Sequence, residues 1–389
     1  MADDDGGPAE LIDGYRPGAF LLAGPTGTLL ASGVSAVVAE SDPDELAARV
    51  TKLLVDGEAP VAVGALPFDV TAPPHLVIPT SVRRAGPAHP HLTAGAPAMP
   101  LPPDVDFQPT PAGYERAVAA AVTALRDDPD LRKVVLARTL RLGFDTEVDI
   151  RALLPGLAAA NPLGYTFAAD LPGARTLVGA SPELLLSRTG TRVASNPLAG
   201  SAPRAADPVA DQAVAEALLT SGKDQDEHEL VVEAVVDALR PFCRRLTVPK
   251  SPSLLRTPTV WHLSTHITGE LADPDVSSLR LAAALHPTPA VCGTPVDAAR
   301  RTIAELEPFD RGFYAGVIGW CDAAGDGEWA VAIRCAEVAG ARMRLFAGAG
   351  IMPASRPELE LAETAAKLRT LLAGLGLDGC FEDNRITRH

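Results

Sequence analysis

Residues 345–372 read LFAGAGIMPASRPELELAETAAKLRTLL, which is an apolar run, a glycine-containing turn and then a helical pattern. The apolar run and the residues before it predict a strand over 342–347, and the later periodicity predicts a helix over 357–374. Ser355 followed three residues later by Glu358 is the pattern of a capping box at the start of that helix. This stretch therefore predicts a strand that leads into an amphipathic helix.

One stripe of this helix is charged. At about 100° per residue, Glu360, Glu363 and Lys367 fall on one side of the helix, away from Leu361 and Leu368. Carboxylates in a first helical turn favour the positive end of the helix dipole, and Glu363 and Lys367 are spaced as an i, i+4 ion pair. Taken alone, the stripe is typical of a solvated face, and only a partner elsewhere in the chain would indicate another role.

Strand and helix patterns are interleaved along the chain without the regular alternation of a doubly wound parallel sheet. KVVLARTLRL (133–142) predicts a strand because it is rich in β-branched residues, and YERAVAAAVTALRDD (114–128) predicts an amphipathic helix. The expected fold class is therefore α+β, as one large layered domain. Further strands are expected in RTLVGA (175–180) and ELLLSR (183–188) and over 260–268, 314–320 and 329–337, and further helices over 43–55, 207–240 with a break, 278–285 and 296–305.

Composition limits the classes of function. A formal net charge of −15 and the lack of a Lys/Arg run argue against nucleic acid as a partner. The opening MADDDGGPAELIDGY has no secretory signal pattern, and no apolar stretch is long enough for a membrane span, so a cytoplasmic protein without a membrane partner is expected. The five cysteines form no CxxC pair, which favours reduced thiols and leaves oxygen ligands as the metal chemistry to consider.

A second acidic pair stands at the start of another predicted helix. Asp224 and Glu227, in GKDQDEHELVVEAVV, are again three residues apart, and the helix dipole again offers an explanation. Two helices that each present such a pair could also converge on one divalent ion. Four carboxylates would suit Mg²⁺ far better than zinc.

Three other motifs carry weaker signals. HLSTH (262–266) has two histidines four apart, but Leu263 stands where a zinc hydrolase needs a glutamate. AGAG (347–350) lacks the third glycine of a dinucleotide fingerprint, although backbone N–H groups near a helix start can hold a carboxylate. Ser181 lies in GASPE rather than in GxSxG, so no nucleophile elbow is indicated.

Nine ordered blocks together resemble the chorismate-utilising enzymes, and most closely the isochorismate synthases. They span residues 110–375, and VGALPFD (63–69) is similar to a weaker amino-terminal block of the same family. The blocks are KVVLART (133–139), GASPELLL (179–186), NPLAGSAPR (196–204), KDQDEHELV (223–231), WHLSTHITGEL (261–271), LHPTPAVCGTP (285–295), ELEPFDRGFYAGVIGW (305–320), GEWAVAIRCAEV (327–338) and LFAGAGIMPASRPELELAETAAKL (345–368).

The resemblance implies an enzyme that acts on the small molecule chorismate, depends on Mg²⁺ and works as a monomer. It implies one α+β domain with β-sheets in the core and helices outside. Residues 1–110 are expected to be the amino-terminal part of that domain, including a Pro-rich surface connection over 84–112. Residues 111–375 would form the chorismate-binding core, and 376–389 a carboxy-terminal tail.

The resemblance also gives the charged stripe a role in a metal site. Glu227 and Glu363 match the family's direct metal ligands. Asp224 and Glu360 match positions near the ion, which they reach directly or through water. The two acidic pairs are therefore expected to face each other across one Mg²⁺ ion.

Isochorismate formation adds water at C2 of the ring while the C4 hydroxyl leaves, so the reaction needs a base and an acid. By resemblance, Lys133 matches the base that activates water, a role that burial or a nearby cation favours. Glu183 matches the acid that protonates the departing hydroxyl, and for that it must be desolvated. The resemblance implies substrate contacts at Gly200, His262, Ala290, Tyr314, Arg334, Gly348, Gly350 and Lys367.

Relatives within the family differ at a few of these positions. Aminodeoxychorismate synthases use a lysine of a PIKGT block as a nucleophile, and here that position is Ala199. Anthranilate synthases lack the base lysine, whereas Lys133 is present. Salicylate synthases, which also eliminate pyruvate, stay open as an alternative because a tyrosine like Tyr314 occurs among the lyases. A noncatalytic protein that binds Mg²⁺ or carboxylates is a second open alternative. The use of the product, in siderophore, menaquinone or salicylate biosynthesis, also stays open.

Overall fold

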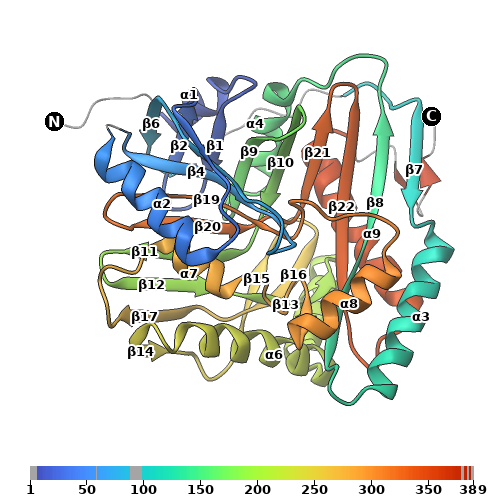
Figure 1. The fold of residues 1–389 in the computed structure, drawn as a ribbon. Helices are drawn as coiled ribbons and strands as arrows, with labels where there is room; N and C mark the ends of the chain where they lie inside the picture. The colour runs from blue at the N-terminus through green and yellow to red at the C-terminus, as the bar shows by residue number, and fades with distance from the viewer. Residues whose placement is uncertain (1–6, 58, 88–98, 378–380, 383–384, 387–389) are drawn as a thin grey trace.

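The computed structural model describes residues 7–57, 59–87, 99–377, 381–382 and 385–386. In this part of the chain, two large antiparallel sheets face each other, and a smaller sheet lies beside them (Figure 1). The ten-stranded sheet has the order β18 (Gly293–Thr294), β8 (Lys133–Gly143), β22 (Arg342–Ile351), β21 (Cys335–Ala339), β10 (Arg175–Ser181), β9 (Tyr165–Leu171), β1 (Phe20–Ala23), β2 (Thr28–Ser32) and β6 (Ser81–Ala85), with β7 (Asp104–Gln108) paired to β8.

The other strands form three sheets. The nine-stranded sheet has the order β14 (Cys243–Thr247), β17 (Ile267–Leu271), β12 (Arg192–Asn196), β11 (Leu184–Thr189), β20 (Gly327–Val331), β19 (Val317–Asp322), β4 (Val61–Leu66), β5 (His75–Ile78) and β3 (Ala36–Val38). The three-stranded sheet has the order β13 (Leu198–Pro203), β16 (Val260–Ser264) and β15 (Ser253–Arg256), and a ribbon is formed by β23 (Phe381–Glu382) and β24 (Arg385–Ile386).

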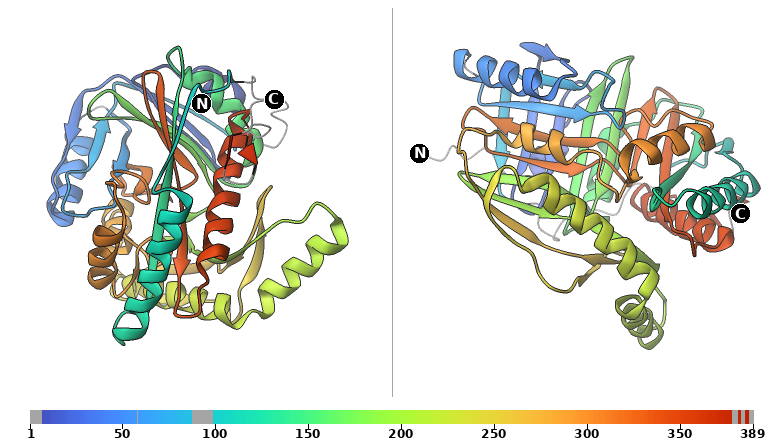
Figure 2. Two further views of the ribbon diagram at one scale, coloured as in Figure 1. Left: turned by 90° about the vertical axis from the view of Figure 1, so that its right-hand side faces the viewer. Right: turned by 60° about the horizontal axis from the view of Figure 1, so that its bottom comes forward.

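Helices cover the sheets from outside. They are α1 (Pro8–Asp13), α2 (Pro43–Asp56), α3 (Pro111–Asp127), α4 (Ile150–Ala160), α5 (Pro208–Thr220), α6 (Gly222–Leu239), α7 (Ser278–Leu285), α8 (Val296–Leu306) and α9 (Pro357–Gly374). Figure 2 shows α5 at the edge of the molecule in both of its views, next to the small sheet. In the described part of the chain, no helix has both the length and the apolar character needed to cross a membrane.

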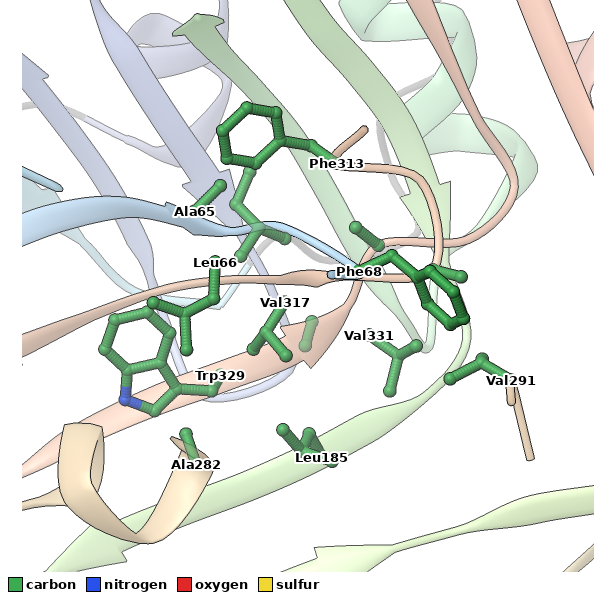
Figure 3. Packing of buried hydrophobic residues seen from close by; sticks show 14 of the residues in the cluster. Ala65, Leu66, Phe68, Leu185, Ala282, Val291, Phe313, Val317, Trp329 and Val331 are labelled. Atoms are coloured by element: carbon green, nitrogen blue, oxygen red, sulfur yellow. The ribbon is translucent and has the colours of Figure 1, made fainter. Parts of the chain in front are cut away.

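The main core fills the space between the two large sheets. Phe167 on β9 and Trp329 on β20 are fully buried there, one from each sheet. Figure 3 shows part of this core, where Leu66, Val317 and Trp329 pack among β4, β19, β20 and α7. Because burial of apolar surface is the main favourable term in folding, this core holds the two sheets together.

A second core lies on the outer face of the ten-stranded sheet, under α1, α4 and α9. Leu345 of β22, Leu154 of α4 and Leu368 of α9 are fully buried in it. Because successive strand residues point to opposite faces, Gly348 and Gly350 of β22 belong to the inner face. The strand thereby buries one face against helices and presents its glycines to the interior.

Several sequence predictions need correction. The capping box is wrong: α9 begins after Arg356 without a side-chain cap, and the Ser355 hydroxyl instead accepts a hydrogen bond from the Met352 N–H at 3.0 Å. The single strand over 329–337 is also wrong, because β20 and β21 belong to different sheets and are separated by a turn that contains Arg334.

Two further differences concern loops and strand ends. The connection over 84–112 contains β7, which pairs with β8, while residues 88–98 lie outside the described part. Tyr314 precedes β19 instead of opening the strand predicted over 314–320.

The predicted helices over 278–285, 296–305 and 357–374 are confirmed as α7, α8 and α9. Strands from both sides of residue 110 share both large sheets, and the division of the chain at that residue stays a prediction.

Candidate active site

A polar cavity lies where β8, β22, β13, β16, α6 and α9 meet, with about 640 Å³ of empty space that is partly open to solvent. Eleven of the fourteen predicted site residues line it. The other three lie beside it: Lys133 pairs with Glu227, Asp224 lies against Gly200, and Glu360 lies on α9 three residues before Glu363. The eleven are Glu183, Gly200, Glu227, His262, Ala290, Tyr314, Arg334, Gly348, Gly350, Glu363 and Lys367.

Lys133, the first residue of β8, is paired with Glu227 of α6. The lysine side chain is completely buried, and its Nζ lies 2.9 Å from Glu227 Oε1. The contact lacks hydrogen-bond geometry, so this Nζ has no hydrogen-bond partner among the described residues. A Cβ placed on Gly350 would lie 2.1 Å from Glu227 Oε1, so the glycine is required for the carboxylate to sit there.

Glu363 and Lys367 form the ion pair that their spacing predicts, but inside the cavity wall. Lys367 Nζ donates to Glu363 Oε1 at 2.5 Å and to the Gly348 carbonyl at 2.9 Å. The Ser201 hydroxyl donates to the same Glu363 oxygen at 2.8 Å. Burial opposes ionisation of Glu363, but the charge and hydrogen bond of Lys367 outweigh it and lower the pKa of this carboxyl. The charged stripe is therefore turned inward instead of being solvated.

Glu360 is almost completely buried and is held by a lysine that the sequence did not single out. Lys223 Nζ donates to Glu360 Oε1 at 2.8 Å, and Glu360 Oε2 is buried without a partner among the described residues. Burial and the charge of Glu363 raise the pKa of Glu360, while Lys223 acts in the opposite direction. Burial alone would lower the pKa of Lys223, but the charges of Glu360, Glu227 and Glu363 raise it.

Asp224 lies in the first turn of α6, where Ser221 caps the helix and the Ser221 hydroxyl donates to Asp224 Oδ2. Burial raises the pKa of Asp224, and the nearby charges of Glu227 and Glu363 act in the same direction. Helices α6 and α9 thus bring both predicted acidic pairs into one electrostatic cluster.

The donor chemistry of this cluster fits Mg²⁺, although no cage is formed. Among the described residues, no three His, Cys, Asp or Glu side chains are arranged as a metal cluster, because the glutamates face ammonium groups. Carboxylate oxygens are the ligands that Mg²⁺ prefers. A divalent cation would also satisfy the unpartnered Glu360 Oε2 and offset the repulsion between Glu360 and Glu363.

Glu183 follows the Ser181-Pro182 turn between β10 and β11 and is buried. Burial raises its pKa to about 7, against a weak hydrogen bond from the Leu198 N–H and the charges of Lys133, Arg334 and Lys367. The carboxyl therefore holds a proton over part of the neutral range, which is a property required of a general acid.

Arg334 lies in the turn between β20 and β21 with a left-handed backbone, at φ 49°. Its Nη2 lies 3.3 Å from His262 Nε2. Burial, together with the charges of Arg334 and Lys367, holds the pKa of His262 well below its usual value, so the ring is neutral and its Nε2 accepts from the guanidinium. A strained non-glycine backbone at such a turn is typical of functional sites.

Tyr314 and two glycines shape the remaining wall. The Tyr314 ring stacks on Phe346, with ring centroids 4.7 Å apart. A Cβ on Gly348 would lie 2.9 Å from the Tyr314 hydroxyl, and Gly200 has a φ of 75°, which favours glycine. These positions need glycine for close approach and for backbone conformation respectively.

Two buried polar groups that support the site were missed from the sequence. His228, next to Glu227, contacts the Ala199 carbonyl at 3.1 Å through Nδ1 and the Thr265 hydroxyl at 2.7 Å through Nε2. Arg311 and Glu307 form a buried ion pair at 2.5 Å. Their residue letters lie in the blocks quoted above, but nothing in the spacing indicated their partners.

Comparison with known proteins identifies relatives that match most of the chain. Residues 100–376 match the family model for chorismate binding enzymes. Isochorismate synthase DhbC of Bacillus subtilis (strain 168) is 49% identical over 383 residues, which cover 95% of this chain and 96% of that protein. Isochorismate synthase EntC of Escherichia coli (strain K12) is 42% identical over 378 residues, with coverage of 93% and 95%.

Solved structures share the fold. The crystal structure of a putative 2,3-dihydroxybenzoate-specific isochorismate synthase, DhbC from Bacillus anthracis, matches with a TM-score of 0.90 at 45% identity, covering 95% of this chain and 100% of that one. Anthranilate synthase component I from Streptococcus pneumoniae TIGR4 matches with a TM-score of 0.68 at 23% identity, covering 92% and 90%. The predicted α+β fold class is confirmed, and the chain belongs to the chorismate binding enzyme family.

Proposed function

We propose that this protein is an isochorismate synthase, an Mg²⁺-dependent isomerase that converts chorismate to isochorismate. The names of its relatives support the reaction. The observation that carries the mechanism is that Glu183, a buried carboxyl with a pKa of about 7, lines the polar cavity, while the buried amine of Lys133 contacts Glu227 of the same cavity wall. The resemblance to the chorismate-utilising enzymes is the ground on which we propose a monomer as the working unit.

In the proposed reaction, a water oxygen bonds to C2 of the ring, the double bonds shift, and the bond from C4 to its hydroxyl breaks. Lys133 Nζ accepts a proton from the attacking water. Glu183, as the carboxylic acid, donates a proton to the departing hydroxyl, which leaves as water. A pKa of about 7 supplies this acid form near neutral pH without making it too weak a donor.

Chorismate carries two carboxylates, and the cavity offers cations to bind them. Arg334 presents a planar guanidinium and Lys367 an ammonium. Neutral His262 accepts from Arg334 and so orients it. Tyr314, Ala290 and the backbones of Gly200, Gly348 and Gly350 complete the proposed substrate contacts.

Asp224, Glu227, Glu360 and Glu363 would hold the Mg²⁺ ion. When bound there, the ion would offset their negative charge and attract a carboxylate of the substrate. Without such compensation, this cluster of acids would repel a dianion.

The test is to supply chorismate with Mg²⁺ and to assay two products in one sample. Isochorismate, measured by chromatography, should form in reversible equilibrium. Pyruvate, measured with a coupled dehydrogenase, should appear at least about ten times more slowly, a gap of only ~1.4 kcal/mol in barrier height. Lys133→Ala should lose water addition because the base is gone.

The competing reactions give different readings. Pyruvate and salicylate released at the rate at which chorismate disappears would replace the proposal with a salicylate synthase, and Tyr314 would be the first residue to exchange. Chorismate that binds without being consumed would indicate a noncatalytic binding protein.

A further inference from the structure

Lys223 has no role in the chemistry proposed above, yet it reaches into the acidic cluster. It lies in the first turn of α6, and its Nζ donates to Glu360 Oε1 at 2.8 Å. Glu360 is 1% exposed and could not be buried as an anion without a cation of this kind.

The ammonium of Lys223 lies among the carboxylates assigned to the metal. Its charge acts on Asp224, Glu360 and Glu363, and the charge of Glu227 acts on it in turn. A lysine ammonium and a magnesium ion both require carboxylate oxygens, and like charges repel at such distances. Lys223 and Mg²⁺ therefore cannot share Glu360 at low cost.

Lys223 also differs from the other two lysines of the cluster. The side chains of Lys133 and Lys367 are 0% and 13% exposed, whereas that of Lys223 is 32% exposed. Lys223 also lines a second, solvent-open cavity beside α6, with about 1140 Å³ of empty space that includes open solvent. Its wall carries the acids Asp226, Glu229 and Glu233 and one other cation, Arg132. If Lys223 leaves Glu360, its ammonium can therefore turn toward this solvent-open cavity, whose wall carries three carboxylates.

We infer that Lys223 is a built-in counter-cation that occupies the acidic cluster when metal is absent and competes with Mg²⁺ for it. On metal binding, Lys223 releases Glu360 and turns toward the outer cavity. Lys223 is thus a positioning residue that sets metal affinity by holding Glu360, and it takes no part in proton transfer. This inference rests on the proposed Mg²⁺ site.

The experiment measures Mg²⁺ binding without chorismate, by titration calorimetry of the full chain after EDTA treatment and dialysis. Lys223→Met removes the competing charge, so the Kd for MgCl₂ should fall about tenfold, or ~1.4 kcal/mol. The Tm of the metal-free variant should fall while its rise on adding Mg²⁺ grows. Lys223→Gln, which keeps a hydrogen-bond donor for Glu360 and so favours folding, should also bind Mg²⁺ more tightly.

Two matched variants separate local competition from other effects. Lys52→Met makes the same change in net charge at an exposed position of α2 and should leave the Kd unchanged. Lys223→Arg keeps the competing charge and should bind no more tightly than the parent protein.

Three results would overturn the inference alone: an unchanged or higher Kd in both neutral variants, equal tightening by Lys52→Met, or equal tightening by Lys223→Arg. If the parent protein and every variant fail to bind Mg²⁺, the proposed metal site falls as well. The two failures are therefore distinguishable.

Discussion

Lys133 Nζ lies 2.9 Å from Glu227 Oε1, and the backbone of Gly350 packs closely against both side chains. The pair joins the proposed base on β8 to a proposed metal ligand on α6. A Cβ on Gly350 would lie 2.1 Å from that oxygen and 2.9 Å from Lys133 Cε. The geometry of the pair therefore requires glycine, which has no side chain, at position 350.

Gly350→Ala should therefore damage activity more than stability. The new methyl group would displace the carboxylate, the lysine or both, and a displacement of about 1 Å in a reacting group can cost on the order of 10²-fold in rate. We expect kcat/KM for isochorismate formation to fall by about that factor while the Tm changes by only a few degrees. Gly86→Ala is the matched control, because a Cβ there meets nothing within 4 Å. Parent-like kinetics for Gly350→Ala would show that the pair tolerates displacement.

Glu227→Gln and Glu363→Gln should each abolish Mg²⁺-dependent turnover without unfolding the chain. An amide keeps the shape of the side chain but loses the charge that a hard cation requires. Circular dichroism should report the parent fold, and calorimetry should report loss of Mg²⁺ binding. Full activity of either variant in EDTA would contradict the metal assignment.

Whether the sequence predicts a contact in this site depends on how far apart the two residues stand along the chain. The inward position of Lys367 and Glu363 follows from helical spacing once a partner for the stripe is known, and β8 and α9 were expected near their observed bounds. The hydrogen bond of Lys223 to Glu360 joins residues 137 positions apart, so no local pattern could reveal it.

The strand predicted over 329–337 failed for a similar reason. Its continuous apolar letters hide the turn where the chain passes from one sheet to the other, and Arg334 adopts a left-handed backbone there that an arginine does not favour locally. Tertiary packing overrides local preference at that turn. The same turn places the Arg334 guanidinium in the cavity wall, so the misread stretch contains a proposed substrate-binding residue.

Glu183→Gln should fold and bind chorismate but lose turnover by about 10²- to 10⁴-fold, since the amide cannot act as a general acid. In the parent enzyme the acid form declines as pH rises through about 7, so kcat/KM should fall above that pH. Initial rates measured over a series of pH values would show this decrease in kcat/KM. Near-normal kcat in Glu183→Gln would remove the residue from the mechanism.

Glu183 should also make stability depend on pH. Its folded pKa of about 7 lies above the ordinary 4.5, so between these values the folded state binds more protons than the unfolded state. The stabilisation that Glu183 contributes is fully present below about pH 4.5 and is lost as pH rises through about 7, amounting to roughly 3 kcal/mol. Urea unfolding at pH 5 and pH 8 should show a smaller loss for Glu183→Gln than for the parent protein. Equal losses would mean that this carboxyl titrates normally.

The buried pair of Arg311 and Glu307 should be the costliest ion pair to break. Arg311 also donates to the carbonyls of Val291 at 2.8 Å and Val135 at 2.7 Å, both of which line the cavity, and Glu307 accepts from the Ala137 N–H at 2.7 Å. Arg311→Met would leave the buried Glu307 carboxylate without its counter-charge and would remove a donor from the carbonyls of Val135 and Val291. We expect the free energy of unfolding, measured by urea titration, to fall by about 3–5 kcal/mol. The KM for chorismate should rise, because Arg311 no longer holds the carbonyls of Val135 and Val291 in the cavity wall.

The matched control is Arg240→Met, which breaks an ion pair with Asp237 whose two side chains are 70% and 72% exposed. It should change the free energy of unfolding by less than about 1 kcal/mol, because exposed pairs contribute little. The double variant Glu307→Gln/Arg311→Met removes the stranded charge and should recover part of the loss. If the double variant is no more stable than Arg311→Met, the cost lies in the hydrogen bonds to Val135 and Val291. Arg311 would then act by tying the cavity wall together and not by neutralising Glu307.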